Sequence, residues 1–572
     1  MEYHGIVGSA GIVVGKAYRY ERYAFDMAGV SVGTPEEELI GYERAVNAAK
    51  AELEALIEHF RALNDDEKIA IFTAHLEILI DETMDEETRD SIQSGVGAAE
   101  SIQTVYDNYI SVFENLEDAL IRERAADMRD VSGRLLRCLA GVPEQNLSAL
   151  PGPVIVAAED LVPSDTASLD RENVLGIITA FGGVTSHSAI IARSYEIPAL
   201  LGVGDAIEQL EDGQEIILDA ESGVFYTEFT EEDRTRYEKK REAFMERVRK
   251  TKLYLDREPI TPDGQRILVE MNIASPEPQN LEKARYSDGV GLFRSEFLYL
   301  GRRTLPTEEE QLQMYRKALM TYGSRPVILR TLDIGGDKQL DCLNLPKEDN
   351  PFLGNRALRL CFTHPDVFRT QLRAALRASV CGNLWIMFPM VGSMDDIRKA
   401  KSFVRDVQNE LQAEGIAFSP DVKIGIMIEI PSIALLADIA AEEVDFASIG
   451  TNDLTQYCTA VDRGNPEIAS YYQTFHPALF RLIGYVIREF SKRGKPVGVC
   501  GEMGGNPLSA AVLIGLGMNQ LSMNASAMAD IKELVCNLST DKAREMADVV
   551  CNLSTADEVQ TYLKKEIESL IS

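Results

Sequence analysis

The sequence predicts a multidomain α/β protein whose C-terminal part is a (β/α)8 TIM barrel. Three observations predict this fold: a length of 572 residues, a helical stretch enclosed by strand-like segments, and a change of pattern near residue 261. One hydrophobic core rarely serves more than about 250–300 residues, so several domains are expected. The eight cysteines are scattered without a CxxC pair, which indicates reduced thiols and a cytoplasmic protein.

Charge and hydropathy exclude several classes of protein. The net charge of −33 argues against nucleic acid or an anionic membrane surface as a partner and favours basic protein partners. No stretch reaches the roughly 18 uninterrupted apolar residues of a membrane span, so no membrane insertion is expected. The N-terminal residues lack a basic segment followed by a long apolar run, and they therefore do not resemble a secretory signal.

The N-terminal half of the sequence predicts a β-rich domain that encloses a helical one. A short glycine-bounded strand, GIVVGKAYRY, precedes the helices, and strand character returns after them in GPVIVAA, NVLGIITA, IPALLGV and QEIILDAESGVFY. In the first helix Thr34 is the expected N-cap, and Glu37 completes a capping box. We expect one domain from residues 1–20 and 146–228, with an all-α domain of residues 21–145 inserted into it.

A charged linker and the barrel follow. Residues 229–260 are highly charged over most of their length and predict a solvated connecting helix. In residues 261–572, apolar runs alternate with helical segments, as is typical of parallel strands buried on both faces. The eight runs are RILVEMNIA, GVGLFRSEF, PVILRTLDIGG, NLWIMFPMVG, KIGIMIEIPS, FASIGTND, PVGVCGEMGG and QLSMNAS.

Polar residues stand where these strands are expected to end, which is the face that carries the chemistry in such barrels. Several guanidinium groups suit a dianionic phosphate and a carboxylate, because each binds oxygens in a bidentate fork. Two carboxylates with room for water suit Mg²⁺. The pattern therefore predicts a site for a small phosphorylated carboxylic acid. The strand ends carry Arg294, Arg330, Glu429, Asn452, Asp453 and Cys500, and loops on the same side carry Arg356 and Arg463.

Each of these residues also has an ordinary structural explanation. A single arginine is more often an ion-pair partner, and the two carboxylates could be helix caps. Cys500 could be a packed small side chain. His187, in the segment FGGVTSHSAIIARS, could be a cap, a metal ligand or a nucleophile. The shared face of the barrel residues favours a functional site.

Seven motifs occur in order: GGVTSHSAIIARSYEIPALLG, GVGLFRSEFLYL, RTLDIGGDKQL, NPFLGNRALR, GIMIEIPS, GTNDLTQYCTAVDRGN and CGEMGG. Together they resemble enzyme I of the phosphoenolpyruvate:sugar phosphotransferase system, nearly from end to end. The resemblance implies transfer of the phosphoryl group of phosphoenolpyruvate to a histidine and then to the histidine-containing phosphocarrier protein. Pyruvate is released, as the first step of sugar uptake. It also implies a cytoplasmic homodimer that associates through the barrel domain.

The resemblance also implies roles for individual residues. His187 is the phosphorylated residue, Thr166 orients it, and Cys500 gives a proton to the enolate carbon. Mg²⁺ lies on Glu429 and Asp453. The residues implied to bind phosphoenolpyruvate are Arg294, Arg330, Asn452, Asp453, Arg463 and Arg356.

Physical chemistry agrees with a nucleophilic His187. A neutral imidazole attacks phosphorus near pH 7 without a deprotonating base. The resulting dianion would lie at a helix N-terminus, where unpaired N–H groups favour negative charge. Because the histidine and the phosphate donor belong to different domains, the β-rich domain is expected to swivel about the linker. Two departures from the family pattern, Val184 for arginine and Asn355 for an aromatic residue, bear on the rates.

Two competing hypotheses fit less well. Pyruvate, phosphate dikinase and phosphoenolpyruvate synthase share the swivelling histidine and the barrel but add a large ATP-binding domain. Residues 21–145 are too few for that domain and contain no glycine-rich phosphate loop. A non-catalytic regulatory protein of the same fold would not need every charged group of the site.

The helical insertion is the most acidic part of the chain. Residues 21–145 hold 11 Lys and Arg against 28 Asp and Glu. Most of these charges are expected to cover a solvated surface, but an acidic face would also steer a basic carrier protein toward this domain. The resemblance places carrier docking there.

Overall fold

The computed structural model describes most of the 572 residues. The described residues are 1–20, 32–62, 66–114, 119–142, 147, 150–161, 165, 169–170, 173–183, 186–276, 283–299, 302, 304–335, 343, 345–346 and 348–571. The chain divides into two compact units, Met1–Arg247 and Val248–Ser572. Each unit is described by itself below.

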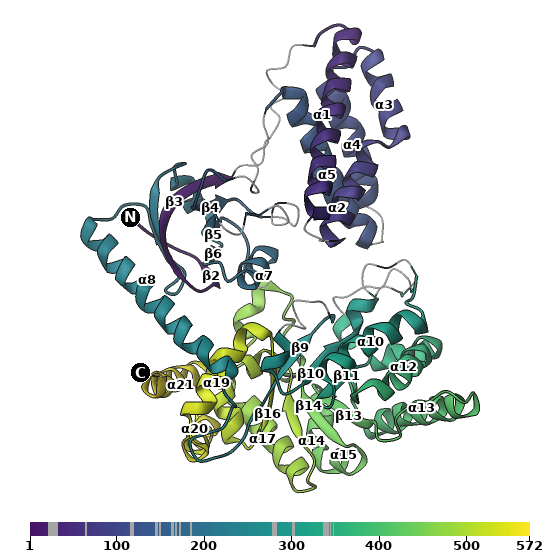
Figure 1. Ribbon diagram of the computed structural model, residues 1–572, viewed down its shortest axis with the longest axis vertical. Coiled ribbons are helices and arrows are strands. Elements are labelled where there is room, and N and C mark those ends of the chain that lie inside the picture. Colours follow the sequence, from purple (N-terminus) through teal and green to yellow (C-terminus); the bar gives the residue numbers. More distant parts are fainter. Residues whose placement is uncertain are drawn as a thin grey trace. The chain divides into compact units, whose positions relative to one another are not determined.

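The helical part of the first unit is a bundle (Figure 1). Thr34 and Glu37 form the expected capping box, because the amide of each residue donates a hydrogen bond to the other's side chain. Leu53, Ile92 and Ile102 are fully buried in the bundle core. The helices are α1 (Pro35–Ala62), α2 (Asp66–Leu79), α3 (Glu82–Gln93), α4 (Ala98–Glu114) and α5 (Ala119–Ala140).

The other part of the first unit is an eight-stranded mixed sheet in the order β1-β8-β7-β3-β4-β5-β6-β2. Strands β3 to β6 run parallel, and the remaining pairs are antiparallel. The strands are β1 (Glu2–His4), β2 (Ile6–Ser9), β3 (Ile12–Tyr20), β4 (Val154–Ala158), β5 (Val174–Thr179), β6 (Ala199–Leu201), β7 (Glu215–Asp219) and β8 (Val224–Tyr226). The short strands β1 and β2 were not expected from the sequence.

Both faces of this sheet are covered, which explains its continuous apolar runs. Along β4, Ile155 joins one core cluster, whereas Val154 and Val156 join the cluster on the opposite face. The helix α7 (His187–Ser194) contributes Ala189 and Ala192 to the second cluster. The sheet therefore provides a packed platform for the helix that begins at the histidine.

The charged helix α8 (Glu231–Lys252) follows the sheet, and the boundary between the two units falls within it. Its N-terminus is capped by Thr230 and Asp233, whose side chains each accept a hydrogen bond from the other's amide. Lys240 forms an ion pair of 2.6 Å with the buried Asp219 of β7. The first turns of α8 are thereby attached to the sheet domain.

The second unit contains a closed barrel of eight parallel strands (Figure 1). The strands are β9 (Leu268–Ile273), β10 (Val290–Arg294), β11 (Pro326–Arg330), β12 (Asn383–Phe388), β13 (Lys423–Ile428), β14 (Phe446–Ile449), β15 (Val497–Val499) and β16 (Gln520–Met523). Every one of the eight apolar runs forms one of these strands. The predicted fold class is confirmed: a TIM barrel, a β-rich domain and a helical bundle.

Helices surround the barrel and bury its outer face. They are α10 (Glu308–Tyr322), α11 (Leu358–Thr363), α12 (Pro365–Ala378), α13 (Met394–Ala413), α14 (Pro431–Leu435), α15 (Ala437–Glu443), α16 (Thr451–Thr459), α17 (Pro477–Ser491), α18 (Pro507–Gly515), α19 (Met528–Asn537), α20 (Thr540–Asn552) and α21 (Ala556–Ile571). Along β9, Val269 and Met271 belong to the outer core. The alternating Glu270 and Asn272 point into the barrel lumen. A separate apolar cluster, which includes Leu292 and Cys500, fills the lumen.

Candidate active site

The candidate residues of the barrel converge because parallel strands all end on one rim. Arg294 and Arg330 are the last residues of the neighbouring strands β10 and β11, and they are opposite each other in the strand register. Glu429 follows β13 directly, and Cys500 follows β15. The structure thus brings the predicted cations, carboxylate and thiol to one end of one lumen.

Arg330 is held rigidly by two carboxylates. Its guanidinium lies 2.6 Å from Glu296 and 2.7 Å from Asp333, and all three side chains are buried. Burial works against the charge, but Asp333 and Glu296 raise the pKa of Arg330 above its ordinary value. The Ser295 hydroxyl donates to the Arg330 carbonyl at 2.7 Å and fixes the end of the strand. Such a cation is oriented before any substrate arrives.

The ion pairs continue across the mouth of the barrel. Asp333 also pairs with Arg356 at 3.0 Å, and Arg356 pairs with Asp453 at 3.2 Å. Asp453 in turn lies 3.6 Å from the guanidinium of Arg463. The neighbouring Asn355 donates its backbone N–H to Glu348 at 2.9 Å. The mouth therefore contains one network in which arginines alternate with carboxylates.

Arg294 differs from the other arginines of the mouth. No carboxylate among the described residues forms an ion pair with it. Burial and the nearby charge of Arg330 lower the pKa of Arg294. Within the described part of the chain, the buried Nε groups of Arg330 and Arg356 also have no hydrogen-bond partner. Three guanidinium groups thus retain capacity for the oxygens of an anion.

Glu429 is 1% exposed and lies within reach of the charges of Arg330 and Arg356. Its Oε1 accepts the Met390 amide N–H at 2.5 Å, and Met390 has a left-handed φ of 53°. Burial, followed by the charges of Asp453 and Asp333, raises the pKa of Glu429 to about 8. Among the described residues, no group of three or more His, Cys, Asp or Glu side chains could hold a metal ion. Glu429 and Asp453 therefore offer two carboxylates, without a third His, Cys, Asp or Glu ligand among the described residues.

Asn452 and Asp453 both lie in the first turn of α16. The Asn452 Oδ1 accepts the Glu502 amide N–H at 3.2 Å, and its carbonyl accepts the Tyr472 hydroxyl at 3.1 Å. The first contact engages the side-chain oxygen and leaves the amide NH₂ as the donating end, whereas the second holds the backbone carbonyl. Asn452 is therefore a neutral donor beside the arginines.

Cys500 is buried in the lumen, and its thiol donates to the Ile449 carbonyl at 3.6 Å. Burial raises the pKa of Cys500 to about 11, although Arg330 and Arg294 act in the opposite direction. The thiol therefore keeps its proton at neutral pH. That state suits a proton donor rather than a nucleophile.

His187 is the first residue of α7, in the other unit. Ser186 is the N-cap, and its hydroxyl accepts the Ala189 amide N–H at 3.3 Å. The Ser188 hydroxyl ties the same turn to the Leu161 carbonyl at 3.1 Å. The His187 side chain lies outside the described part of the structure. So do Thr166 and Val184, whose predicted roles stay predictions.

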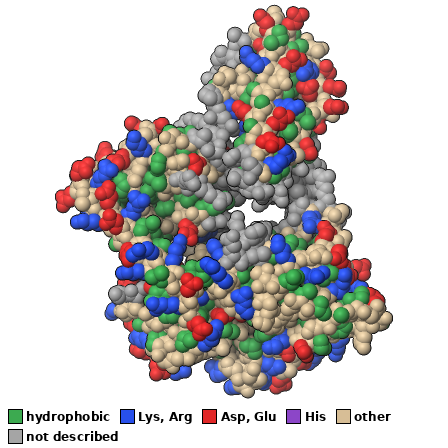
Figure 2. Space-filling model, in the orientation of Figure 1, with side chains coloured by type: hydrophobic (Ala, Val, Ile, Leu, Met, Phe, Trp, Pro, Cys, Tyr) green, Lys and Arg blue, Asp and Glu red, His purple; other side chains and the backbone are tan. Residues whose placement is uncertain are grey.

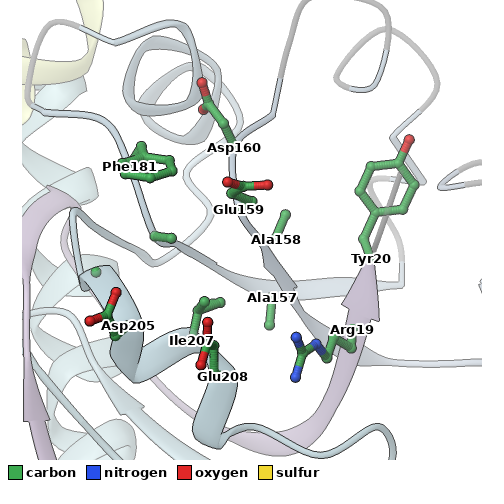
Figure 3. Close-up of a pocket in the computed structure, with 12 residues that line it drawn as sticks. Arg19, Tyr20, Ala157, Ala158, Glu159, Asp160, Phe181, Asp205, Ile207 and Glu208 are labelled. Carbon is green, nitrogen blue, oxygen red and sulfur yellow. The ribbon is translucent and has the colours of Figure 1, made fainter. Parts of the chain in front are cut away.

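A pocket lies in the sheet domain, where β3, β4 and β5 end (Figure 3). Its lining includes four carboxylates and one arginine: Glu159, Asp160, Asp205, Glu208 and Arg19. Phe181, at its edge, is 58% exposed and precedes the glycines that lead to α7. An excess of carboxylates disfavours a phosphate ligand. The lining of this pocket therefore does not favour a phosphate ligand.

Sequence reasoning did not select Glu296, Asp333 and Met390. Glu296 and Asp333 stand two and three residues after the strand-end arginines Arg294 and Arg330. That spacing was an available indication, because a buried arginine needs a carboxylate close by. Met390 could not be found in this way, since it contributes only its backbone N–H.

Family models place this chain among enzymes that use phosphoenolpyruvate. Residues 4–124 match the N-terminal domain of the PEP-utilising enzymes, residues 150–223 match the mobile domain, and residues 249–540 match the PEP-binding domain. His187 falls within the mobile domain, and the arginines of the mouth fall within the PEP-binding domain.

Relatives identify the particular family. The chain is 43% identical to the phosphoenolpyruvate-protein phosphotransferase of Priestia megaterium over 98% of both proteins. It is 42% identical to that of Geobacillus stearothermophilus, covering 98% of this chain and 97% of the relative. It is 40% identical to that of Bacillus subtilis (strain 168) over 99% of each. The chain therefore belongs to the phosphoenolpyruvate-protein phosphotransferase family, and the resemblance to enzyme I is confirmed. Within the described residues, no helix is long and apolar enough to cross a bilayer.

Proposed function

We propose that this enzyme transfers the phosphoryl group of phosphoenolpyruvate to its own His187 and then to a histidine-containing phosphocarrier protein. This is the first step of sugar uptake by the phosphotransferase system. One observation carries the proposal: Arg294, without an ion pair among the described residues, lies at the barrel mouth beside the pre-oriented Arg330. A fixed cation next to an uncompensated one favours a multiply charged anion.

Phosphoenolpyruvate has two anionic groups, a phosphate and a carboxylate. The mouth has several guanidinium groups, enough to bind both. The Nε groups of Arg330 and Arg356 are donors without a partner among the described residues. Arg463 is 27% exposed at the rim, where it can reach a substrate oxygen. Asn452 adds a neutral donor. In this proposal these residues bind the substrate, with Asp453 holding Arg356 and Arg463 in place.

The residues present also fit Mg²⁺. Glu429 and Asp453 are both buried, and the charge of Asp453 contributes to the raised pKa of Glu429. Mg²⁺ commonly takes one or two carboxylates, with substrate oxygens and water completing its octahedron. When bound there, the ion would supply positive charge to the oxygens of phosphoenolpyruvate. The fit rests on the donor set, and Glu429 and Asp453 are the ligands we propose.

The reaction balances with groups of this chain. An imidazole nitrogen of His187 attacks phosphorus, an N–P bond forms, and the bond from phosphorus to the enol oxygen breaks. The departing electron pair leaves pyruvate as its enolate. The Cys500 thiol, which burial keeps protonated, then gives its proton to the methylene carbon and yields pyruvate. Water returns a proton to the thiolate.

The second transfer needs movement of the histidine domain. His187 and the barrel residues belong to separate units, so the sheet domain of residues 1–20 and 146–228 is proposed to swivel. The segment 229–260, which contains α8, is the proposed linker. We propose that the carrier docks on the helical domain of residues 21–145. There, acidic side chains gather on the visible face (Figure 2). Homodimerisation through residues 261–572 and a cytoplasmic location complete the proposal.

One experiment tests this function directly. The full chain is incubated with ³²P-labelled phosphoenolpyruvate and Mg²⁺, and acid-labile label on His187 and pyruvate release are followed together. Equal amounts of label and pyruvate are expected. Label on another residue would refute the assignment of His187. Labelling that requires ATP and pyruvate instead would indicate a dikinase. For the metal, Glu429→Ala and Asp453→Ala should each require more Mg²⁺, and unchanged titrations in both would refute that site.

A further inference from the structure

Asn272 and Ser522 form a hydrogen-bonded pair in the lumen beside Cys500. The Ser522 hydroxyl of β16 donates to Asn272 Oδ1 at 2.6 Å. The Asn272 Nδ2 of β9 donates to the Cys500 carbonyl at 3.1 Å. In the barrel order, β16 lies between β9 and β15. The Asn272 side chain on β9 therefore reaches across β16 and holds Cys500, the residue that follows β15.

The serine determines which way the amide faces. An amide side chain has an accepting oxygen at one end and a donating NH₂ at the other. Because Ser522 donates to the oxygen, the NH₂ of Asn272 is directed at Cys500. Without Ser522, the amide would lose this orientation, and its oxygen could turn toward the carbonyl oxygen and repel it.

Ser522 is itself confined by its neighbours. A Cβ atom added to Gly291 on β10 would lie 2.5 Å from the Ser522 hydroxyl and 2.7 Å from the Glu270 carboxyl oxygen. A larger residue at position 291 would displace the serine. The glycine thus permits a close approach that leaves Ser522 little freedom.

Cys500 needs such a support because it lies beyond regular pairing. The last pair between β15 and β16 is Val499 with Leu521. Two contacts hold the other side of Cys500. Its amide N–H donates to the Ile449 carbonyl at 3.1 Å, and the next residue, Gly501, packs closely against Thr451. The contact from Asn272 holds the carbonyl and so limits rotation of the peptide that carries the thiol.

We propose that Asn272, oriented by Ser522, is a positioning residue that fixes the face from which Cys500 protonates the enolate. The inference rests on the proposed function, in which Cys500 is the acid. Neither Asn272 nor Ser522 needs to touch the substrate. Loss of the pair should leave phosphoryl transfer largely intact but allow the thiol to approach from more than one direction, or water to protonate in its place.

The test uses the full chain and a stereochemical readout. Phosphoenolpyruvate carrying one deuterium at a defined methylene position is converted in tritiated water, and the configuration of the chiral methyl group of pyruvate is determined. The wild type is expected to give one configuration. Asn272→Ala and Ser522→Ala should both give mixed configurations. Asn272→Ala should also slow pyruvate formation roughly tenfold, with the KM for phosphoenolpyruvate within about threefold of the wild type.

Two further variants separate the possible outcomes. Asn383→Ala is the matched control, because Asn383 also donates its amide to a backbone carbonyl, at 3.1 Å, but at the start of β12. It should keep one configuration, which excludes a general effect of losing an amide from the barrel. Cys500→Ala should give mixed configurations while still labelling His187. If Cys500→Ala gives mixed configurations but Asn272→Ala and Ser522→Ala do not, the positioning role is wrong. If Cys500→Ala retains a single configuration, the proton-donor role and the positioning role both fail.

Discussion

The barrel mouth and the helix that begins at His187 differ in how firmly they hold their functional residues. In the mouth, Arg330 and Arg356 are each buried between two carboxylates, and Asp333 connects them. In the sheet domain, His187 begins an eight-residue helix whose first turn is tied down by two serine hydroxyl groups. The ion-pair network of the mouth resists any change of geometry, whereas α7 places a single residue, His187, at its N-terminus.

This difference indicates that the barrel mouth, and not the histidine helix, holds the groups whose positions and charges are fixed in advance. Phosphoryl transfer depends mainly on positioning and on fixed charge, and a buried ion-pair network supplies both. In the proposed function His187 meets two partners in turn, and such a residue gains little from a rigid enclosure. A change in the mouth should therefore lower a rate, whereas a change of the histidine should remove a reaction.

The largest expected effect is that of His187→Ala. This change should abolish acid-labile phosphorylation and leave phosphoenolpyruvate binding nearly unchanged, because the binding residues belong to the other unit. Phosphorylation is measured with labelled phosphoenolpyruvate, and binding is measured by calorimetry with Mg²⁺ present. A variant that still acquires acid-labile label would show that another residue is the acceptor.

Changes in the mouth should slow the reaction without removing it. Arg294→Ala or Arg330→Ala should reduce phosphoryl transfer roughly 10³-fold or more, as expected when a cation on transferring oxygens is lost. Single-turnover labelling of His187 measures this rate. The matched control is Arg398→Ala on α13, because Arg398 is 58% exposed and pairs with Glu443 outside the mouth. A control as slow as the mouth variants would indicate a general loss of structure instead.

The sequence predicted the barrel well for a clear physical reason. Parallel strands buried on both faces give uninterrupted apolar runs, and each run ends in a residue at the rim. Arg294 and Arg330 could be placed in this way. The pairing of Arg330 with Glu296 and Asp333 was indicated only by their spacing from the strand ends, because both carboxylates come after the regular strands, where the apolar pattern stops.

The sheet domain was harder to predict. The strands β1 and β2 have three and four residues, too few to show alternation.

In the barrel, one contact of the site could not be predicted. The hydrogen bond from Met390 to Glu429 uses a backbone N–H, which any residue type could supply. The roles of Thr166 and Val184 stay predictions, because these residues lie outside the described part of the chain.

Glu270 is a buried carboxyl of the barrel that lacks the arginine partners found in the mouth. No cation of the described residues forms an ion pair with Glu270, and burial, followed by the charge of Asp288, raises its pKa to about 8. An unfolded chain would release this proton near pH 4.5. Between these values the folded barrel holds the extra proton, so its stability falls as the pH rises, until the loss is complete above pH 8.

Glu270→Gln should remove this pH dependence. We expect little change in stability at pH 4.5 and a gain of about 5 kcal/mol at pH 8.5. Urea unfolding is followed by the fluorescence of Trp385, the only tryptophan, which lies in the barrel strand β12. As a control, Glu489→Gln removes a carboxyl that pairs with Lys492 at 2.8 Å, and it should not stabilise the barrel at high pH. Equal stability of Glu270→Gln and the wild type at pH 8.5 would contradict the expectation.

The smallest expected effect concerns long-range charge, which neither the mouth nor the histidine helix uses. The helix α3 exposes Glu82, Glu86 and Asp90 to solvent, and nearby side chains on the visible face of the bundle are also acidic (Figure 2). Exposed charges steer a partner and raise its association rate, but they contribute little to a docked complex. Replacing all three by Gln, Gln and Asn should slow transfer to a basic phosphocarrier only a few-fold at low salt.

Ionic strength and a matched variant complete this test. Steering weakens as the Debye length shortens, so the difference from the wild type should disappear near 1 M salt, where that length is about 3 Å. Self-phosphorylation should not change, because its residues lie outside the bundle. The control removes three exposed carboxylates from the barrel, Asp395, Asp406 and Asp541. It reduces the negative charge of the chain by the same amount, so an equal slowing of carrier transfer would show that the total charge matters and that α3 is not the docking face.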